Sequence, residues 1–373
     1  MSLSSLPPSI RDNYEIIRKL GEGLSGITYE VISKKDNQKY VIKIYDIKKI
    51  QSLGKILYDG RELEPIPILR TMLHNNEIIR KLLREKTCEN IKKIYDVGDI
   101  NKPYVITEYL EYNLRDYVRE RGISHLDAIK IILDVVRGLK FVFNNTELYC
   151  HGDVSPDNIF ITERKGEIIA KIGDFEGARY PTVSAIAPLF KPEYKPRERI
   201  PDRLGKYDVY ALGVIIAELI LKEEEAMRIK EEGGEAINEF VIPQAFKNLI
   251  RKSAAIQRDE RFTLDEFLDA IRSIYESILK EKEEKKMERE KAEERKKDIS
   301  KIIEETKNVT SLYLNILEGL RRNFDLNKFK KIKEEVDPKF DELIRLGKKG
   351  MEESPAKVEE LISYLKNKLD KLS

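Results

Sequence analysis

A polar segment between Cys150 and Thr162 contains the residues of this sequence that are best suited to chemistry. It reads C-H-G-D-V-S-P-D-N-I-F-I-T, and its second half is an apolar run that predicts a strand. Asp153 lies early in the polar half and Asn158 closes it. Phosphoryl transfer requires a carboxylate that faces the acceptor hydroxyl and a nearby amide oxygen that holds a metal ion. The types and spacing of these two residues therefore predict a phosphoryl-transfer site.

A second acidic residue, Asp174, follows the next apolar run. That run, Glu167–Ile172, comes after a Lys165-Gly166 turn, so the two runs predict a hairpin whose end returns Asp174 to Asn158. Two oxygen ligands on adjacent loops suit Mg²⁺, which completes its shell with water and phosphate oxygens. We therefore expect Asn158 and Asp174 to be metal ligands.

These segments resemble two signatures of the protein kinase superfamily. H-G-D-V-S-P-D-N is similar to the catalytic loop H-R-D-L-x-x-x-N, and G-D-F-E is similar to D-F-G. The resemblance implies a two-lobed α+β fold, with a small β-rich lobe and a larger helical lobe. It also implies ATP and Mg²⁺ as cofactors, and Asp153 as the base that accepts the proton of an acceptor hydroxyl.

A glycine-rich segment supplies a further part of this resemblance. It reads L-G-E-G-L-S-G-I-T-Y-E-V from Leu20 to Val31, which is G-x-G-x-x-G between two strand-like runs. A dinucleotide fold needs a helix after the glycines, whereas residues 27–33 alternate like a strand. The motif is therefore similar to the glycine hairpin that kinases lay over ATP, where backbone N–H groups approach phosphate closely. The expected nucleotide contacts are Leu20, Gly21, Gly23, Gly26 and Thr28, the last in place of the usual valine.

Lys43 lies in the next predicted strand, Lys39–Tyr45, on the same face as Val41. It resembles the lysine of V-A-I-K, which pairs with the α- and β-phosphates. The alternative is an ordinary exposed lysine on a strand. The number of residues between Lys43 and the glycine segment favours the phosphate-binding role. Val41 is expected to be a further nucleotide contact.

The kinase resemblance requires a glutamate that pairs with Lys43 from a helix of the small lobe. Apolar spacing predicts that helix over residues 68–86, and Glu77 lies near its middle. Glu62 and Glu64 are closer in sequence, but Pro65 and Pro67 argue against a helix there. Glu77 is therefore the expected partner of Lys43.

The strand Pro103–Leu110 resembles the hinge between the two kinase lobes. The resemblance implies that Thr107 controls the back of the nucleotide pocket and that the backbone of Glu108 and Leu110 bonds the adenine edge. Phe160, in the strand after the catalytic loop, completes the expected nucleotide contacts.

Three further motifs follow in the order typical of kinases. Y-K-P-R-E, ending at Glu198, resembles A-P-E, and Y-D-V-Y-A-L-G resembles the start of a helix whose aspartate, Asp208, caps the catalytic loop. Arg261, in R-D-E-R-F-T, is expected to pair with Glu198. The expected regions are a tail at 1–13, a small lobe at 14–109, a large lobe at 110–278, a charged helical linker at 279–298 and a helical region at 299–373.

Besides Thr28, the sequence departs from the kinase pattern at three positions. Gly152 replaces the arginine that grips a phosphorylated activation loop in many kinases, so we expect activity without such phosphorylation. H-G-D also resembles small-molecule phosphotransferases, and Ser155 replaces the lysine that marks Ser/Thr kinases. Glu176 replaces the glycine of D-F-G, which stiffens that turn.

Three functions remain open from the sequence. The first is an ATP-dependent Ser/Thr protein kinase that acts on protein substrates, with its own chain as one candidate substrate. The second is a small-molecule phosphotransferase of the aminoglycoside-kinase-like type. The third is a pseudokinase that works as a binding module through its helical tail, although intact Lys43, Asp153, Asn158 and Asp174 argue against it.

Composition indicates which partners and which compartment to expect for the protein. The 373 residues carry a formal net charge of +2, which argues against a nucleic-acid partner, and no run approaches a membrane span of about 18 apolar residues. Two cysteines and the absence of a basic-then-apolar leader favour the cytoplasm. The run Glu281–Lys297 is almost wholly charged and predicts a solvated, coiled-coil-like helix. The amphipathic segments after it, the last starting at Ser354-Pro355, are expected to form a small bundle, pack on the kinase lobe, self-associate or bind a regulatory partner.

Overall fold

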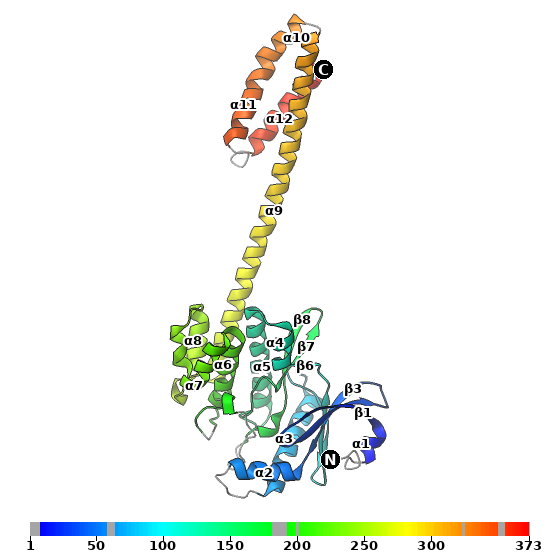
Figure 1. Cartoon of the computed structure of the whole chain (residues 1–373), viewed down its shortest axis with the longest axis vertical. Helices are drawn as coiled ribbons and strands as arrows, with labels where there is room; N and C mark the ends of the chain where they lie inside the picture. Colours follow the sequence, from blue (N-terminus) through cyan, green and yellow to red (C-terminus); the bar gives the residue numbers. More distant parts are fainter. Residues whose placement is uncertain are drawn as a thin grey trace. The chain divides into compact units, whose positions relative to one another are not determined.

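The computed structural model describes residues 8–57, 64–180, 192–198, 201–322, 325–349 and 355–372. The chain divides into two compact units, Met1–Leu279 and Lys280–Ser373. The first unit contains a sheet-rich lobe and a helix-rich lobe (Figure 1), which confirms the predicted two-lobed α+β fold.

The smaller lobe is built on a five-stranded antiparallel sheet in the order β1-β2-β3-β5-β4. Its strands are β1 (Tyr14–Glu22), β2 (Gly26–Ser33), β3 (Lys39–Tyr45), β4 (Ile94–Asp99) and β5 (Lys102–Glu108). Thr28 of β2 faces Lys43 of β3, and Val41 of β3 faces Thr107 of β5. This register brings four residues predicted to bind the nucleotide onto adjacent strands.

Three helices accompany the sheet: α1 (Pro8–Asn13), α2 (Ile47–Leu57) and α3 (Pro65–Glu85). The predicted tail at 1–13 is therefore helical over its second half, and residues 1–7 lie outside the described residues. Glu62 also lies outside them.

Helix α3 begins earlier than the sequence predicted. We expected it to start at residue 68 because of the two prolines, but it begins at Pro65 and contains Pro67 in its first turn. The first N–H groups of a helix have no partner within the helix, so proline costs little there. Glu64 is the N-cap residue of α3.

The larger lobe carries the catalytic segment on a small sheet supported by helices. Its elements are β6 (Tyr112–Asn113), α4 (Leu114–Arg121), α5 (His125–Asn145), β7 (Ile159–Arg164), β8 (Glu167–Ile172), η2 (Phe175–Gly177), η3 (Pro192–Tyr194), α6 (Lys206–Ile220), α7 (Glu223–Glu232), η4 (Gly234–Glu239), α8 (Gln244–Ser253), η5 (Arg258–Glu260) and the first part of α9 (Leu264–Arg322). Strands β7 and β8 form the predicted hairpin. Side chains of Asn113 and Ser124 cap α4 and α5 by accepting hydrogen bonds from backbone N–H groups, as short polar residues do at helix starts.

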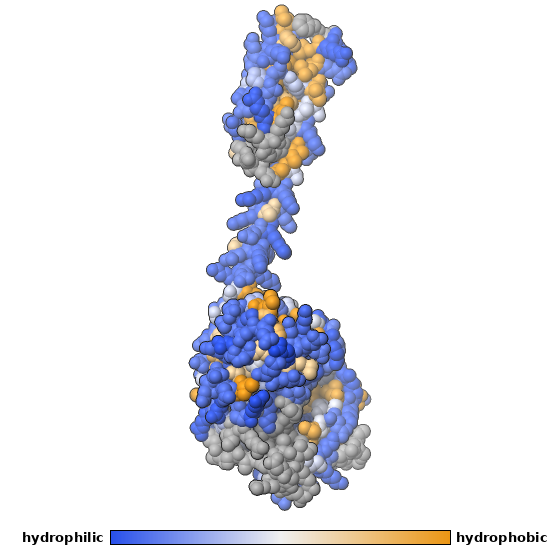
Figure 2. All heavy atoms as spheres, turned by 60° about the vertical axis from the view of Figure 1, so that its left-hand side comes forward, coloured by the Kyte–Doolittle hydropathy of each residue, from blue (hydrophilic) through white to orange (hydrophobic). Residues whose placement is uncertain are grey.

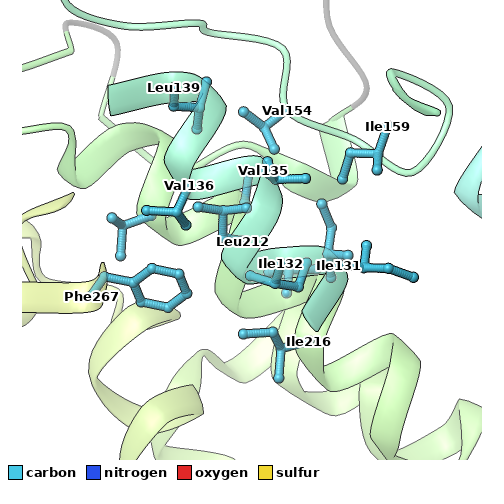
Figure 3. Close-up of a cluster of buried hydrophobic side chains, with 14 of the residues drawn as sticks. Ile131, Ile132, Val135, Val136, Leu139, Val154, Ile159, Leu212, Ile216 and Phe267 are labelled. Atoms are coloured by element: carbon cyan, nitrogen blue, oxygen red, sulfur yellow. The ribbon is translucent and has the colours of Figure 1, made fainter. Parts of the chain in front are cut away.

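The core of this lobe lies directly beneath the catalytic segment. Figure 3 shows Val135 and Val136 of α5 in one cluster with Leu212 of α6 and Phe267 of α9. Val154, which follows Asp153, belongs to the same buried cluster. The loop that carries the chemistry is therefore anchored by apolar burial on one side.

The second unit contains residues 280–322 of α9, α10 (Leu326–Lys331), the π-helical turn η6 (Ile332–Val336), α11 (Asp337–Lys349) and α12 (Pro355–Asp370). Its amphipathic faces pack against one another in a separate core that includes Val309, Val336, Leu343 and Leu365. Of the arrangements that the sequence left open, the structure shows the small bundle.

The structure tests two sequence predictions for this second unit. The predicted break at Asp337-Pro338 does not occur, because the helix continues from α10 through the π-helical turn η6 into α11, and Pro338 lies in the first turn of α11, where a missing N–H costs little. The charged run Glu281–Lys297 is helical and exposed, and its visible face in Figure 2 is almost entirely hydrophilic. Ser354, the expected cap of the last helix, lies outside the described residues.

No helix within the described ranges is both long enough and apolar enough to cross a membrane.

Candidate active site

Asp208, in the first turn of α6, fixes the backbone of the catalytic loop. Its carboxylate accepts hydrogen bonds from the N–H groups of His151, at 2.8 Å, and Gly152, at 2.9 Å. These two bonds confirm the predicted cap. Gly152 has a φ of 76°, a left-handed backbone conformation that glycine adopts without the steric cost of a Cβ.

His151 connects the catalytic loop to the end of β8. Its ring is fully buried, and burial lowers the pKa of this imidazole, which favours the neutral form. Nδ1 accepts from the N–H of Asp153 at 3.3 Å, so Nε2 carries the proton and donates to the carbonyl of Gly173 at 3.1 Å. The neutral ring therefore joins the two segments that hold the expected base and metal ligand.

Asn158 orients the carboxylate of Asp153. Nδ2 of Asn158 donates to the backbone carbonyl and to Oδ2 of Asp153, both at 2.8 Å. The carbonyl of Asn158 accepts from the N–H of Gly173 at 2.9 Å, which brings Asp174 beside it as the hairpin predicted. Since both amide protons of Asn158 point to Asp153, its amide oxygen is directed away from that residue.

Lys43 reaches from β3 to the segment after β8. Its Nζ lies 3.4 Å from Oδ2 of Asp174 and 2.6 Å from Oε1 of Glu176. Burial lowers the pKa of Lys43, but these two carboxylates outweigh burial and raise that pKa above its usual value. Burial raises the pKa of Asp174, but Lys43 and His151 outweigh it and hold that pKa below its usual range. Lys43 is therefore a cation and Asp174 an anion at neutral pH.

The structure does not bring Glu77 to Lys43, which corrects the predicted ion pair. Oε2 of Glu77 lies 2.6 Å from Nε of Arg80, one turn along α3. Successive residues of a helix are rotated by about 100°, and the buried positions next to Glu77 are Asn75 and Asn76. Glu77 therefore lies on a half-exposed face of α3, and its carboxylate pairs with Arg80 of the same helix.

The glycine hairpin contains glycines of two kinds. A Cβ on Gly21 or Gly23 would meet no atom within 4 Å, so the backbone there is open to a ligand. A Cβ on Gly26 would lie 2.0 Å from the carbonyl oxygen of Ile44. Gly26 is therefore required by the close approach of β3, whatever its role toward a nucleotide.

Glu108, the last residue of β5, uses its backbone N–H and its carboxylate within the protein. The N–H of Glu108 donates to the carbonyl of Lys93 at 3.0 Å, and its carboxylate lies 2.8 Å from Nζ of Lys171. Thr107 and Leu110 flank this residue and are half-buried. The N–H of Glu108 is used within the protein, so any adenine contact from this residue falls to its carbonyl.

The comparisons with known proteins agree with this geometry. A family model described as "Protein kinase domain" matches residues 14–318. The chain belongs to the protein kinase family. This establishes the resemblance inferred from the sequence motifs.

Relatives of this kinase include "Mitogen-activated protein kinase 2" of Pneumocystis carinii, 25% identical over 221 residues, which are 57% of this chain and 58% of the relative. "Extracellular signal-regulated kinase 2" of Dictyostelium discoideum is 25% identical over 232 residues, which are 59% of this chain and 58% of the relative. A probable serine/threonine-protein kinase of Clostridium perfringens is 26% identical, with 56% of this chain and 29% of the relative covered. The chain thus spans less than two thirds of the length of each of these relatives.

The residues present fit a magnesium ion. An amide oxygen from Asn158 and a carboxylate from Asp174 are hard oxygen donors, and a backbone hydrogen bond holds their segments together. Within the described ranges no group of three or more His, Cys, Asp or Glu side chains could hold a metal. A two-ligand magnesium site needs no such group, because water and phosphate oxygens complete its shell.

Two residues near the site were missed as site residues in the sequence analysis. Glu176 contacts Lys43, although the sequence marked it only as a departure from D-F-G. Lys92 lies with its Nζ 3.7 Å from the centroid of the Phe160 ring, and burial lowers the pKa of this ammonium to about 8. An acidic residue directly after Asp174-Phe175 is unusual, and this could have identified Glu176 as a site residue. Nothing in the sequence distinguished Lys92 from its neighbour Lys93.

Proposed function

We propose that this kinase transfers the γ-phosphate of ATP to serine or threonine hydroxyls of protein substrates, its own chain included. The observation that carries the proposal is the orientation of Asp153 by Asn158, on a loop held to Asp174 by backbone and histidine hydrogen bonds. A preoriented carboxylate beside a metal-binding pair is the arrangement that phosphoryl transfer needs.

Each residue of the site has a role in this reaction. The open backbone at Gly21 and Gly23 covers the phosphates, and the Lys43 ammonium balances their charge. The carboxylate of Asp153 orients the acceptor hydroxyl and accepts its proton. Asn158 and Asp174 would hold Mg²⁺, which would neutralise charge on the phosphate oxygens. The pocket expected for adenine is bounded by Val41, Thr107, the carbonyl of Glu108, Leu110 and Phe160, with Leu20 and Thr28 from the glycine segment.

A protein acceptor is favoured by elements of the larger lobe that follow the site. Nη2 of Arg261 lies 2.9 Å from Oε2 of Glu198, which is the pair expected from the A-P-E-like motif, and Arg261 is buried. This pair anchors residues 192–198 to the helical lobe. The printed names of the relatives, which include serine/threonine-protein kinases, support the same acceptor class.

The test is transfer of radiolabelled γ-phosphate from Mg·ATP to the kinase and to a generic protein mixture, beside an Asp153→Asn variant. We expect label on serine or threonine, measured by phosphoamino-acid analysis, and its loss in the variant. Equal labelling by the variant would refute the role of Asp153. Nucleotide binding without any labelled protein would refute the protein acceptor and favour the small-molecule acceptor.

A further inference from the structure

We propose that Glu176 is the carboxylate that positions Lys43 for the triphosphate, in place of a glutamate on helix α3. The inference rests on the proposed function, because it assigns a positioning residue within that site. Protein kinases use a glutamate of the small-lobe helix for this ion pair. Here Nζ of Lys43 lies 2.6 Å from Oε1 of Glu176, closer than its 3.4 Å distance from Asp174.

Both carboxylate oxygens of Glu176 have hydrogen-bond donors. The hydroxyl of Tyr45 donates to Oε1 at 2.8 Å, and the hydroxyl of Ser25 donates to Oε2 at 3.2 Å. The residue is only 5% exposed. A buried carboxylate with a lysine and two hydroxyl partners is held in one orientation, because leaving any partner costs a hydrogen bond to a charge.

The partners of Glu176 come from the elements that the proposed function places around the phosphates. Lys43 and Tyr45 lie on β3, and Ser25 lies between Gly23 and Gly26 of the glycine hairpin. Glu176 itself lies in η2, two residues after Asp174. One carboxylate thus links the lysine, the hairpin and the metal-binding segment.

Helix α3 presents amides where a carboxylate would be expected. Nδ2 of Asn75 donates to the carbonyls of Glu176, at 3.1 Å, and Ala178, at 2.9 Å. Nδ2 of Asn76 donates to the hydroxyl of Tyr45 at 2.9 Å. Both asparagines are buried, so these positions of α3 support the segment that carries Glu176 through neutral hydrogen bonds.

The location of this acid changes what the ion pair depends on. When the glutamate is on the helix, rotation of the helix breaks the pair. Here the pair joins β3 to η2, and the α3 side chains Asn75 and Asn76 support it through hydrogen bonds to backbone carbonyls of the η2 segment and to Tyr45. The position of Lys43 therefore depends directly on the segment after Asp174, and on α3 through its support of that segment and of Tyr45.

The first experiment compares Glu176→Gln with Glu77→Gln in the full chain. We expect Glu176→Gln to raise KM for ATP and lower kcat, reducing kcat/KM by about 10- to 100-fold, as loss of a charge-assisted hydrogen bond does. Glu77→Gln removes an acid of the same size from α3 and is expected to stay within about twofold of the wild type, because Glu77 contacts Arg80. Equal effects of the two variants, or a larger effect of Glu77→Gln, would overturn the proposal.

The second experiment moves the carboxylate to α3. In Glu176→Gly the acid is lost, and Asn76→Glu adds one beside the Tyr45 hydroxyl. We expect kcat/KM of the Glu176→Gly/Asn76→Glu double variant to be at least about fivefold higher than that of Glu176→Gly. A merely structural role of Glu176 would not give this recovery. Comparison of these two variants still tests the proposal if Glu176→Gln does not fold. A folded double variant that shows no recovery of kcat/KM would count against a positioning role.

A third readout separates this proposal from the proposed function. Affinity for a fluorescent ATP analogue is measured for the wild type, Glu176→Gln and Glu77→Gln, independently of any phosphate transfer. If the wild type transfers no phosphate, the proposed function fails, yet weaker binding by Glu176→Gln alone still supports the role of Glu176. If the wild type transfers phosphate and both variants match it in rate and affinity, only the role of Glu176 fails.

Discussion

Lys92 is a buried ammonium whose replacement by methionine should stabilise the protein. It is 9% exposed, and burial lowers its pKa from 10.5 to about 8, an effect that Asp174 and Glu108 only partly offset. The fall of this pKa from 10.5 to about 8 corresponds to a penalty of about 3 kcal/mol for the buried charge, at about 1.4 kcal/mol per pKa unit. The cation–π contact with Phe160 offsets up to about 2 kcal/mol of this penalty. We expect Lys92→Met to raise the free energy of unfolding by about 1–3 kcal/mol at pH 7.

The pH dependence gives this prediction its sign. The pKa in the folded state is lower than in the unfolded state, so between about pH 8 and 10.5 the unfolded chain binds more protons at this site. The site therefore adds stability to the wild type as pH rises through that window, and its penalty is complete below about pH 8. The advantage of Lys92→Met should shrink across the same window.

Urea unfolding at pH 7 and at pH 10 measures both effects. Lys93→Met is the matched control, because Lys93 is the exposed neighbour and its replacement should change stability by less than about 0.5 kcal/mol. The reasoning is refuted if Lys92→Met destabilises the protein at pH 7, or if its advantage is the same at both pH values.

Three further predictions concern the catalytic loop and the glycine hairpin. Asp208→Ala leaves two buried N–H groups without their acceptor, so we expect a loss of about 2–4 kcal/mol in urea unfolding together with loss of phosphate transfer; full stability would contradict this account. Gly26→Ala forces a Cβ against the Ile44 carbonyl, so it should lower the melting temperature, whereas Gly21→Ala, with no atom within 4 Å of its Cβ, should leave it nearly unchanged; equal shifts would show that the close approach is unimportant. Because Gly152 offers no guanidinium to a phosphorylated loop, phosphatase treatment should leave the initial rate of phosphate transfer within about twofold, and a large drop after treatment would show regulation of another kind.

The sequence alone was sufficient for the residues that act within short, contiguous motifs. Asp153 and Asn158 share one loop, and the hairpin after them brings Asp174 back, so local spacing determined their proximity. Lys43 followed from the alternation of one strand. The pairs of Asp208 with the loop backbone and of Arg261 with Glu198 followed from the order of motifs that the family shares.

Only the tertiary structure decided which acid serves Lys43. Glu77 had a plausible position along α3, but the face that this helix buries presents Asn75 and Asn76, and that face depends on packing against η2 and β3. Glu176 lies more than a hundred residues from Lys43 and Tyr45 in sequence, so no local pattern could link them. The same holds for Lys92, whose lowered pKa comes from burial that the sequence does not reveal. Spacing fixes contacts within a segment, whereas contacts between distant segments depend on how the lobes pack.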